Sequence, residues 1–142
     1  AYISGTRYRL YVPNSAPAYV YIIGSDITNK VTRVFPPTDN ISPALLYSSS
    51  NIAIPDEKWY IEMDDTRGTD HVCVIYSAKP IDIKALMAQA ERSAGTFCQR
   101  VRQALGSRAV AASAITYTPG QIGFKAESTA TAVPVFIDIQ HQ

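Results

Sequence analysis

The sequence predicts a mainly β fold with minor α (α+β): an antiparallel, β-sandwich-like domain with a two-helix insertion or crossover at about residues 82–106. Two observations lead to this prediction. Short runs of β-branched and aromatic residues are separated by Pro, Asn, Asp, Gly and Ser at intervals of roughly 8 to 12 residues, which is typical of antiparallel β domains. The spacing of apolar residues then changes to the 3.6-residue period of a helix. It returns to the pattern of strands after residue 108.

The first strands are expected in the tyrosine-rich segments near the N-terminus. Residues 7–12 (RYRLYV) alternate in character, whereas residues 18–24 (AYVYIIG) are apolar on both faces, so the second segment is expected at the centre of a sheet. Turn-forming residues separate these segments from each other and from VTRVF at 31–35, which predicts a meander of three strands. The prolines of residues 36–43 indicate a long surface loop.

Three further strands are expected before the helical segment, at residues 51–55, 58–63 and 71–77. The last two are separated by DDTRGTD, whose aspartates and glycine are typical of a loop that reverses the chain. The acidic residues of this segment are therefore expected to have a structural role in the turn.

Two consecutive helices are expected next. The first begins after Asp82, a suitable N-cap, because apolar residues then recur at the 3.6-residue spacing of an amphipathic helix. The second begins with TFCQ at 96–99, which has the form of a capping box, and ends at Gly106. Its apolar stripe leaves Arg100 and Arg102 on the side expected to face solvent.

The last third of the chain is expected to return to strands, in AVAASAITYT, QIGFKAE and ATAVPVFIDIQ. Pro134 predicts an edge position for the last of them, because proline cannot donate to a neighbouring strand. A chain of 142 residues suits one domain. We expect a single domain over residues 1–142, with a β core at about 7–83, the helical segment at 82–106 and C-terminal strands at 108–140.

Composition and motifs argue against several classes of function. The 13 basic and 12 acidic residues give a net charge of +1 and form no basic run, so no nucleic-acid partner is expected. The apolar runs fall far short of the roughly 18 residues that span a bilayer, so no transmembrane segment is expected. The sequence contains no G-x-G-x-x-G, P-loop or G-x-S-x-G motif, and no cofactor is expected.

The densest group of reactive side chains lies in DDTRGTDHVCVIYS, residues 64–77. Its aspartates lack the spacing of a calcium loop, and its histidine and cysteine lack the paired spacing of a zinc site, so no metal site is predicted; Asp64, Asp70 and His71 are the residues that could hold an ion. The Cβ atoms of His71 and Cys73 would lie about 6 to 7 Å apart on one face of a strand, which is loose for the direct hydrogen bond of a nucleophilic pair. We expect no catalytic residues here and a buried Cys73.

The two cysteines leave an alternative open. Cys73 and Cys98 are compatible with one disulfide in an oxidising compartment or with two buried thiols. The sequence does not choose between them.

The aromatic residues provide the candidates for ligand binding. Tyrosines on strands can form cross-strand packing pairs, or a platform for a sugar or a peptide. Trp59, next to Lys58, is the best single candidate for an exposed aromatic contact. The predicted ligand-binding residues are Trp59, Tyr60, Tyr19 and Tyr21.

Four segments resemble a bacterial family of domains of unknown function, DUF4384. They are YRLYVPNSAPAYVYIIG, KVTRVFPP, IAIPD and WYIEMDDTRGTDHVCVIYSAKPID. The matching features are an aromatic-rich strand at 19–22, a strand that ends in Phe35 and Pro36, the pair Ile54 and Pro55, and alternating apolar residues after Gly68. The resemblance covers roughly residues 7–83.

The resemblance implies an accessory module without catalytic residues of its own. Similar modules are appended to bacterial kinases, caspase-like peptidases and envelope or secreted proteins. We therefore expect a non-enzymatic module of a periplasmic, outer-membrane-anchored or secreted protein that contacts a protein partner. A β domain that binds a small molecule, peptide or glycan is the alternative, and a cysteine-dependent hydrolase is a remote one. The oligomeric state is left open.

Overall fold

A computed structural model describes residues 1–47, 51–58, 60–117, 124–126 and 129–142. It confirms a mainly β fold with two helices. The strands are β1 (Arg7–Tyr8), β2 (Leu10–Pro13), β3 (Ala18–Ser25), β4 (Val31–Phe35), β5 (Ala44–Leu45), β6 (Asn51–Ile54), β7 (Ile61–Glu62), β8 (Gly68–Ser77), β9 (Ile115–Tyr117), β10 (Phe124–Ala126) and β11 (Ala132–His141). The helices are α1 (Ile83–Arg92) and α2 (Phe97–Leu105), followed by short 3-10 turns at Gly106–Arg108 and Ala112–Ala114.

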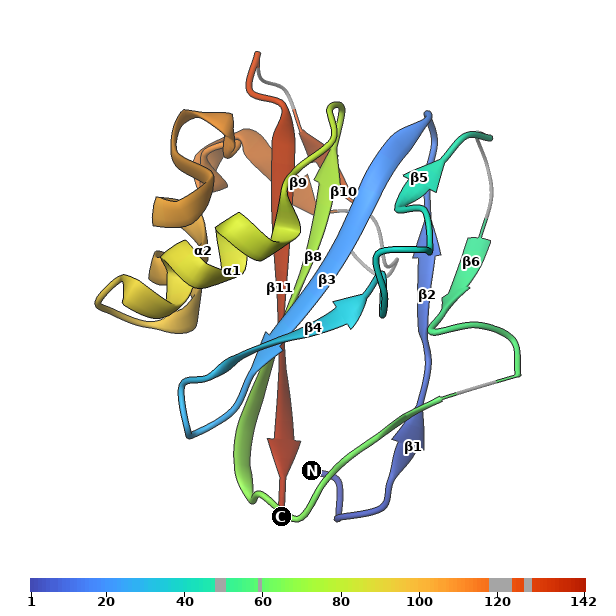
Figure 1. Cartoon of the computed structure of the whole chain (residues 1–142), viewed down its shortest axis with the longest axis vertical. Helices are drawn as coiled ribbons and strands as arrows, with labels where there is room; N and C mark the ends of the chain where they lie inside the picture. Colours follow the sequence, from blue (N-terminus) through green and yellow to red (C-terminus); the bar gives the residue numbers. More distant parts are fainter. Residues whose placement is uncertain (48–50, 59, 118–123, 127–128) are drawn as a thin grey trace.

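The main sheet is antiparallel, with the strand order β11-β8-β3-β4 and with β5 also paired to β3. Strand β8 lies inside this sheet, paired with β11 along all ten residues and with β3 from Ser77 to His71. The two helices cover one face of the sheet, and the β2–β6 pair lies on the other side (Figure 1). The architecture is therefore layered, with the main sheet in the middle.

Strand alternation divides the core between the two faces of this sheet. On β3, Tyr21 and Ile23 point to the helices, while Val20 and Ile22 point to the β2–β6 side. All four side chains are buried, which confirms the prediction that this strand is central. Strand β11 lies at the edge of the main sheet, as Pro134 predicted.

Both helices begin at the residues that the sequence predicted. The Asp82 carboxylate accepts a hydrogen bond from the Ala85 N–H at 3.0 Å. Thr96 and Gln99 form the reciprocal capping box, with bonds of 2.9 and 3.3 Å. Among the described residues, neither helix is long and apolar enough to cross a membrane.

Three local predictions are wrong. The predicted first strand is two short strands: β1 pairs with β7 and β2 pairs with β6, so β2 does not join β3 and β4 in a meander. The segment predicted as a strand at 58–63 contributes only Ile61–Glu62, within the part of it that the structure describes. Arg100 does not face solvent, because the β3–β4 hairpin packs over its side of α2 and supplies hydrogen-bond acceptors; only 4% of its surface is exposed.

Candidate functional site

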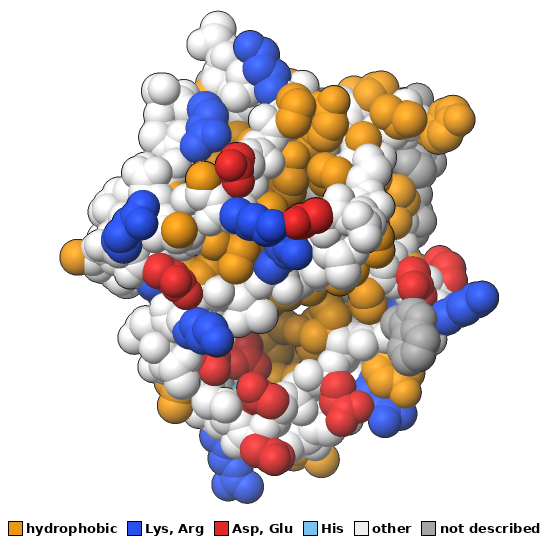
Figure 2. Space-filling model, in the orientation of Figure 1, with side chains coloured by type: hydrophobic (Ala, Val, Ile, Leu, Met, Phe, Trp, Pro, Cys, Tyr) orange, Lys and Arg blue, Asp and Glu red, His pale blue; other side chains and the backbone are white. Residues whose placement is uncertain are grey.

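An open groove of about 320 Å³ lies between the start of α1 and the loop from β4 to β5. Figure 2 shows hydrophobic side chains gathered on this face, with basic and acidic side chains next to one another across them. The apolar part of the lining is Tyr21, Pro36, Ile41, Pro43, Ile81 and Ile83. A surface of this composition suits an apolar ligand with a few polar contacts at its rim.

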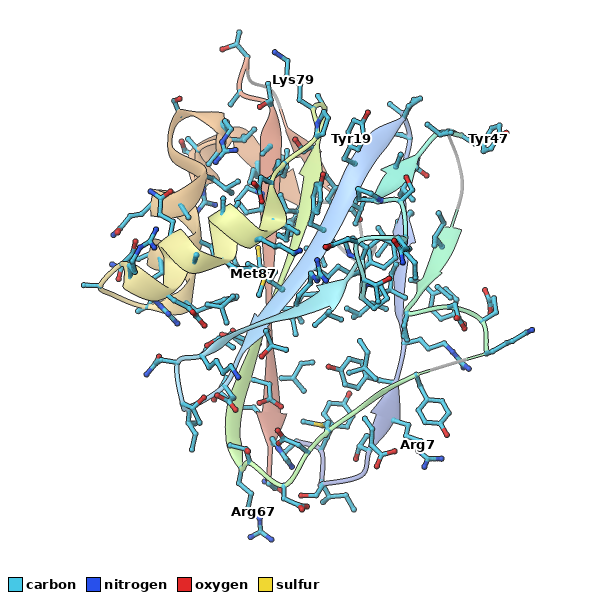
Figure 3. The ribbon with its side chains drawn as sticks, viewed as in Figure 1. Arg7, Tyr19, Tyr47, Arg67, Lys79 and Met87 are labelled. Atoms are coloured by element: carbon cyan, nitrogen blue, oxygen red, sulfur yellow. The ribbon has the colours of Figure 1, made fainter. Side chains whose placement is uncertain are left out.

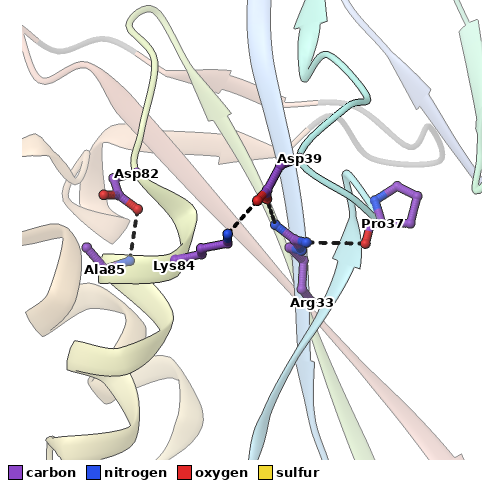
Figure 4. A network of polar contacts seen from close by, with 6 residues as sticks. All are labelled: Arg33, Pro37, Asp39, Asp82, Lys84 and Ala85. Atoms are coloured by element: carbon purple, nitrogen blue, oxygen red, sulfur yellow. Dashed lines mark hydrogen bonds and ion pairs between the residues drawn. The ribbon is translucent and has the colours of Figure 1, made fainter.

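An ionic bridge crosses the groove and holds its two walls together (Figure 4). The Asp39 carboxylate, in the β4–β5 loop, accepts from Arg33 Nη1 at 2.7 Å and forms a second ion pair with Lys84 Nζ of α1. Arg33 Nη2 also donates to the Pro37 carbonyl at 3.3 Å. Hydrogen bonds from Lys84 and then from Arg33 lower the pKa of Asp39 below its ordinary value.

Tyr21 forms part of the groove lining. Its ring is 3% exposed, and its hydroxyl accepts a hydrogen bond from the Ile81 N–H at 2.9 Å. Tyr19 lies two residues earlier on the same face of β3 and is half-buried against the helix-side core. Of these two predicted ligand-binding residues, Tyr21 lines the groove and Tyr19 does not. The Tyr21 hydroxyl is already hydrogen-bonded to the backbone of Ile81.

Tyr60 belongs to a different surface. Its ring is 39% exposed, with the guanidinium carbons of Arg7 and Arg9 at 4.4 and 5.9 Å from the ring centroid. Arg7 also pairs with Glu62 at 2.8 Å. Figure 3 places Arg7 and Tyr19 at opposite ends of the molecule, so Tyr60 and Tyr19 do not form one platform. Trp59 lies outside the described residues.

The candidate metal ligands do not converge. Asp64 accepts from the Thr66 N–H at 2.7 Å and closes a turn. His71 Nδ1 lies 2.7 Å from Asp138, while Asp70, on the opposite face of β8, lies 3.8 Å from His141. Within the described residues, no three His, Cys, Asp or Glu side chains are placed to hold a metal ion.

Both cysteines are free thiols in the structure. Cys73 has no exposed surface, and burial raises the pKa of its thiol well above the ordinary value; Cys98 is half-buried. His71 stacks on Phe97 at 6.1 Å and bonds Asp138. Cys73 thus lies buried in the helix-side core, and His71 has other partners.

The groove depends on residues that the sequence did not single out. Arg33, Asp39 and Lys84 come from a strand, a loop and a helix, and the last two lie 45 positions apart in the chain. Neither periodicity nor a local motif connects them. The only local signal was the group of prolines at 36–43, which correctly indicated a loop.

The comparison with protein families decides the family question. The model for the family described as "Domain of unknown function (DUF4384)" matches residues 1–80. The chain belongs to the DUF4384 family. No curated protein and no solved structure matches it.

The DUF4384 match ends before α1, yet described elements beyond it complete the main sheet and its core. Strand β11 covers one edge of β8 along ten residue pairs, and α1 and α2 supply Leu86, Val101 and other residues of one core cluster. The groove itself is made from both parts, since Arg33 and Asp39 lie within the match and Lys84 lies beyond it.

Proposed function

We propose that this DUF4384 chain is a non-catalytic interaction module that binds a short, apolar segment of a protein partner in the groove between α1 and the β4–β5 loop. The observation that supports this proposal is an open groove with an apolar lining, in which Ile41 is exposed, Pro43 is partly buried and the Arg33–Asp39–Lys84 bridge joins the two walls. Ile41, at 43% exposure, offers the partner a hydrophobic contact beside Pro36 and Pro43.

The charge balance of the groove supports an apolar partner segment. Arg33 and Lys84 are offset by Asp39 and Asp82, and both carboxylates already accept hydrogen bonds within the fold. A strongly charged segment would gain little from such a balanced rim, whereas apolar area removed from water contributes about 25 cal/mol per Å². The volume of about 320 Å³ suits a few side chains of an extended segment.

A non-catalytic role is supported by the state of the reactive side chains. Cys73 is buried as a thiol with a raised pKa, and His71 is held by Asp138 and Phe97. A cysteine nucleophile needs a thiolate and access for the substrate. Neither condition is met at Cys73, which argues against the cysteine-dependent hydrolase.

The cellular context of the proposal follows from the family resemblance. We place the module in a bacterial envelope or secreted protein, whether periplasmic, anchored at the outer membrane or released. Fractionation of cells that express the full-length gene product, with immunodetection of this segment, tests this; recovery in the cytoplasm alone would contradict it.

Tyr60 favours a second candidate, a small-molecule or glycan site. An exposed ring flanked by two guanidinium groups can stack on a sugar while the charged groups bind hydroxyls or carboxylates. A glycan-array signal that is lost in Tyr60→Ala would favour this site over the groove.

The groove is tested with peptides selected for binding to the purified chain. A displayed peptide library is enriched on the wild-type protein alone, and the dissociation constants of synthetic hits are then measured for the wild type and for Ile41→Glu. We expect Ile41→Glu to weaken binding by more than about tenfold, because it places a charge against an apolar ligand. The matched control is Ile27→Glu, since Ile27 is 61% exposed and does not line the groove.

Circular dichroism and thermal melts of both variants establish that each is folded. Peptides that bind Ile41→Glu as tightly as the wild type, or an absence of enriched peptides, would overturn the proposed function.

A further inference from the structure

A second hollow, of about 440 Å³, lies between the β3–β4 hairpin and the turn that joins α1 to α2. It is separate from the groove and shares no lining residue with it. Its lining includes Asn29, Lys30, Glu91, Ser93, Gly95 and Arg100.

Arg100 is the unusual member of this lining. Its side chain is almost wholly buried, with Nη1 donating to the Asn29 carbonyl at 3.0 Å and Nη2 to the Ser25 hydroxyl at 3.4 Å. Its Nε is buried and has no hydrogen-bond partner among the residues that the structure describes. Within the described ranges, no carboxylate lies at ion-pair distance from this guanidinium. Burying a cation without an anion is costly, and neutral neighbours such as the Ala90 carbonyl, at 3.5 Å from Nη1, and the Phe97 ring, at 6.0 Å from Cζ, offset that cost only in part.

The surroundings of Arg100 favour an anion. Lys30 supplies a second positive charge to the hollow, and α2, a helix of nine residues, begins directly after Gly95 and Thr96. The positive end of a helix attracts negative groups. Glu91 is the opposing charge in the lining, but its Oε1 already accepts from the Val31 N–H at 3.0 Å.

We propose that this hollow binds a phosphate-type oxyanion, with Arg100 and Lys30 as its positively charged partners. The anion supplies the charge that the buried guanidinium lacks, while Arg100 keeps its bonds to the hairpin carbonyl and hydroxyl. Arginine suits such a site because its planar, permanently charged group matches the oxygen geometry of phosphate.

The first test is a titration of the isotope-labelled chain with inorganic phosphate, followed by two-dimensional NMR. We expect saturable shifts of the backbone amides at 28–30 and 93–95, and of the Arg100 Nε–H, with one common midpoint. Sodium chloride at the same ionic strength is the reference. Shifts equal to those in chloride, or shifts elsewhere on the surface, would show non-specific screening and overturn the proposal.

Two substitutions at the hollow should act in opposite directions. Lys30→Met should weaken phosphate binding by about tenfold, because a charge-assisted contact is lost. Glu91→Gln should strengthen it severalfold, because the amide oxygen can still accept from Val31 while the repulsion is removed. Lys79→Met, which changes an exposed lysine outside the hollow, is the matched control and should bind as the wild type does.

Affinities that are the same in Lys30→Met, Glu91→Gln and the wild type would contradict the site even if phosphate binds somewhere on the chain. A parallel titration with O-phosphoserine distinguishes a site that accepts phosphate esters from one that accepts the free ion only. Peptide binding in the groove is measured separately and does not enter this result.

Discussion

The hydroxyl of Tyr21 accepts a hydrogen bond from the backbone N–H of Ile81 at 2.9 Å and so ties strand β3 to the segment that leads into α1. Tyr21 lies within the family match and Ile81 lies one residue beyond its end. This one bond therefore links the two parts of the chain at the floor of the groove.

Removal of the Tyr21 hydroxyl should destabilise the fold. We expect Tyr21→Phe to lower the free energy of unfolding by about 1 to 3 kcal/mol, because the buried Ile81 N–H loses its acceptor while the ring is kept. Urea denaturation followed by circular dichroism measures the change. Tyr11→Phe is the control: this ring is 52% exposed, and the change should stay within about 0.5 kcal/mol. Equal effects of the two substitutions would contradict the role of the bond.

Gly68 should tolerate no side chain. Its φ is +146°, and a Cβ there would lie 2.4 Å from Cγ2 of Ile27. We expect Gly68→Ala to cost about 1 to 3 kcal/mol of stability from backbone strain, with a further loss from the clash. Gly5→Ala measures strain without a clash, since Gly5 has φ +77° and a Cβ added there would meet no described atom within 4 Å.

Thermal melts of Gly68→Ala combined with Ile27→Ala test the clash directly. The double variant should recover part of the loss of Gly68→Ala, and the part that remains measures the backbone strain of a side chain at φ +146°. Strict additivity of the two single changes would rule the contact out.

The ionic bridge should be visible in the titration of Asp39. Its folded pKa is lowered by Lys84 and Arg33, so the bridge stabilises the fold above the ordinary carboxyl pKa and loses its effect as the pH falls through the lower, folded pKa. NMR titration of the Asp39 side chain measures this. Lys84→Met should raise the pKa of Asp39 towards the ordinary value, and Lys79→Met should leave it unchanged; no difference between the two variants would mean that the bridge does not form in solution.

Cys73 should resist alkylation in the folded protein. Burial raises the pKa of its thiol, so little thiolate forms at neutral pH and the reagent has no access to the sulfur. Mass spectrometry after treatment with iodoacetamide should find Cys73 modified only under denaturing conditions, and Cys98, which is half-buried, modified faster. Rapid modification of Cys73 in the folded chain would restore the cysteine-dependent enzyme as a candidate.

The features that the sequence predicted well are local ones. The Asp82 cap and the Thr96–Gln99 capping box each involve residues three positions apart, so the pattern that signals them also contains their partners. The central position of β3 could be predicted because consecutive residues, which point to opposite faces of the sheet, are both apolar.

Predictions about pairing and exposure were less successful. Residues 7–12 have the alternation of a single strand, but Arg7–Tyr8 and Leu10–Pro13 pair with different partners, β7 and β6. Arg100 was expected in solvent from its place on α2, and it is buried because the β3–β4 hairpin offers the Asn29 carbonyl and the Ser25 hydroxyl to its guanidinium.

The amino-acid order alone determined where the helices begin, which strand is apolar on both faces and that one edge strand contains proline, because these follow from steric and hydrogen-bonding preferences within a few residues. Only the tertiary structure decided that Asp39 meets Lys84 across a groove and that Arg100 is buried without a carboxylate partner within the described part of the chain. Such contacts depend on how distant segments pack against one another, and a local sequence pattern does not predict that packing.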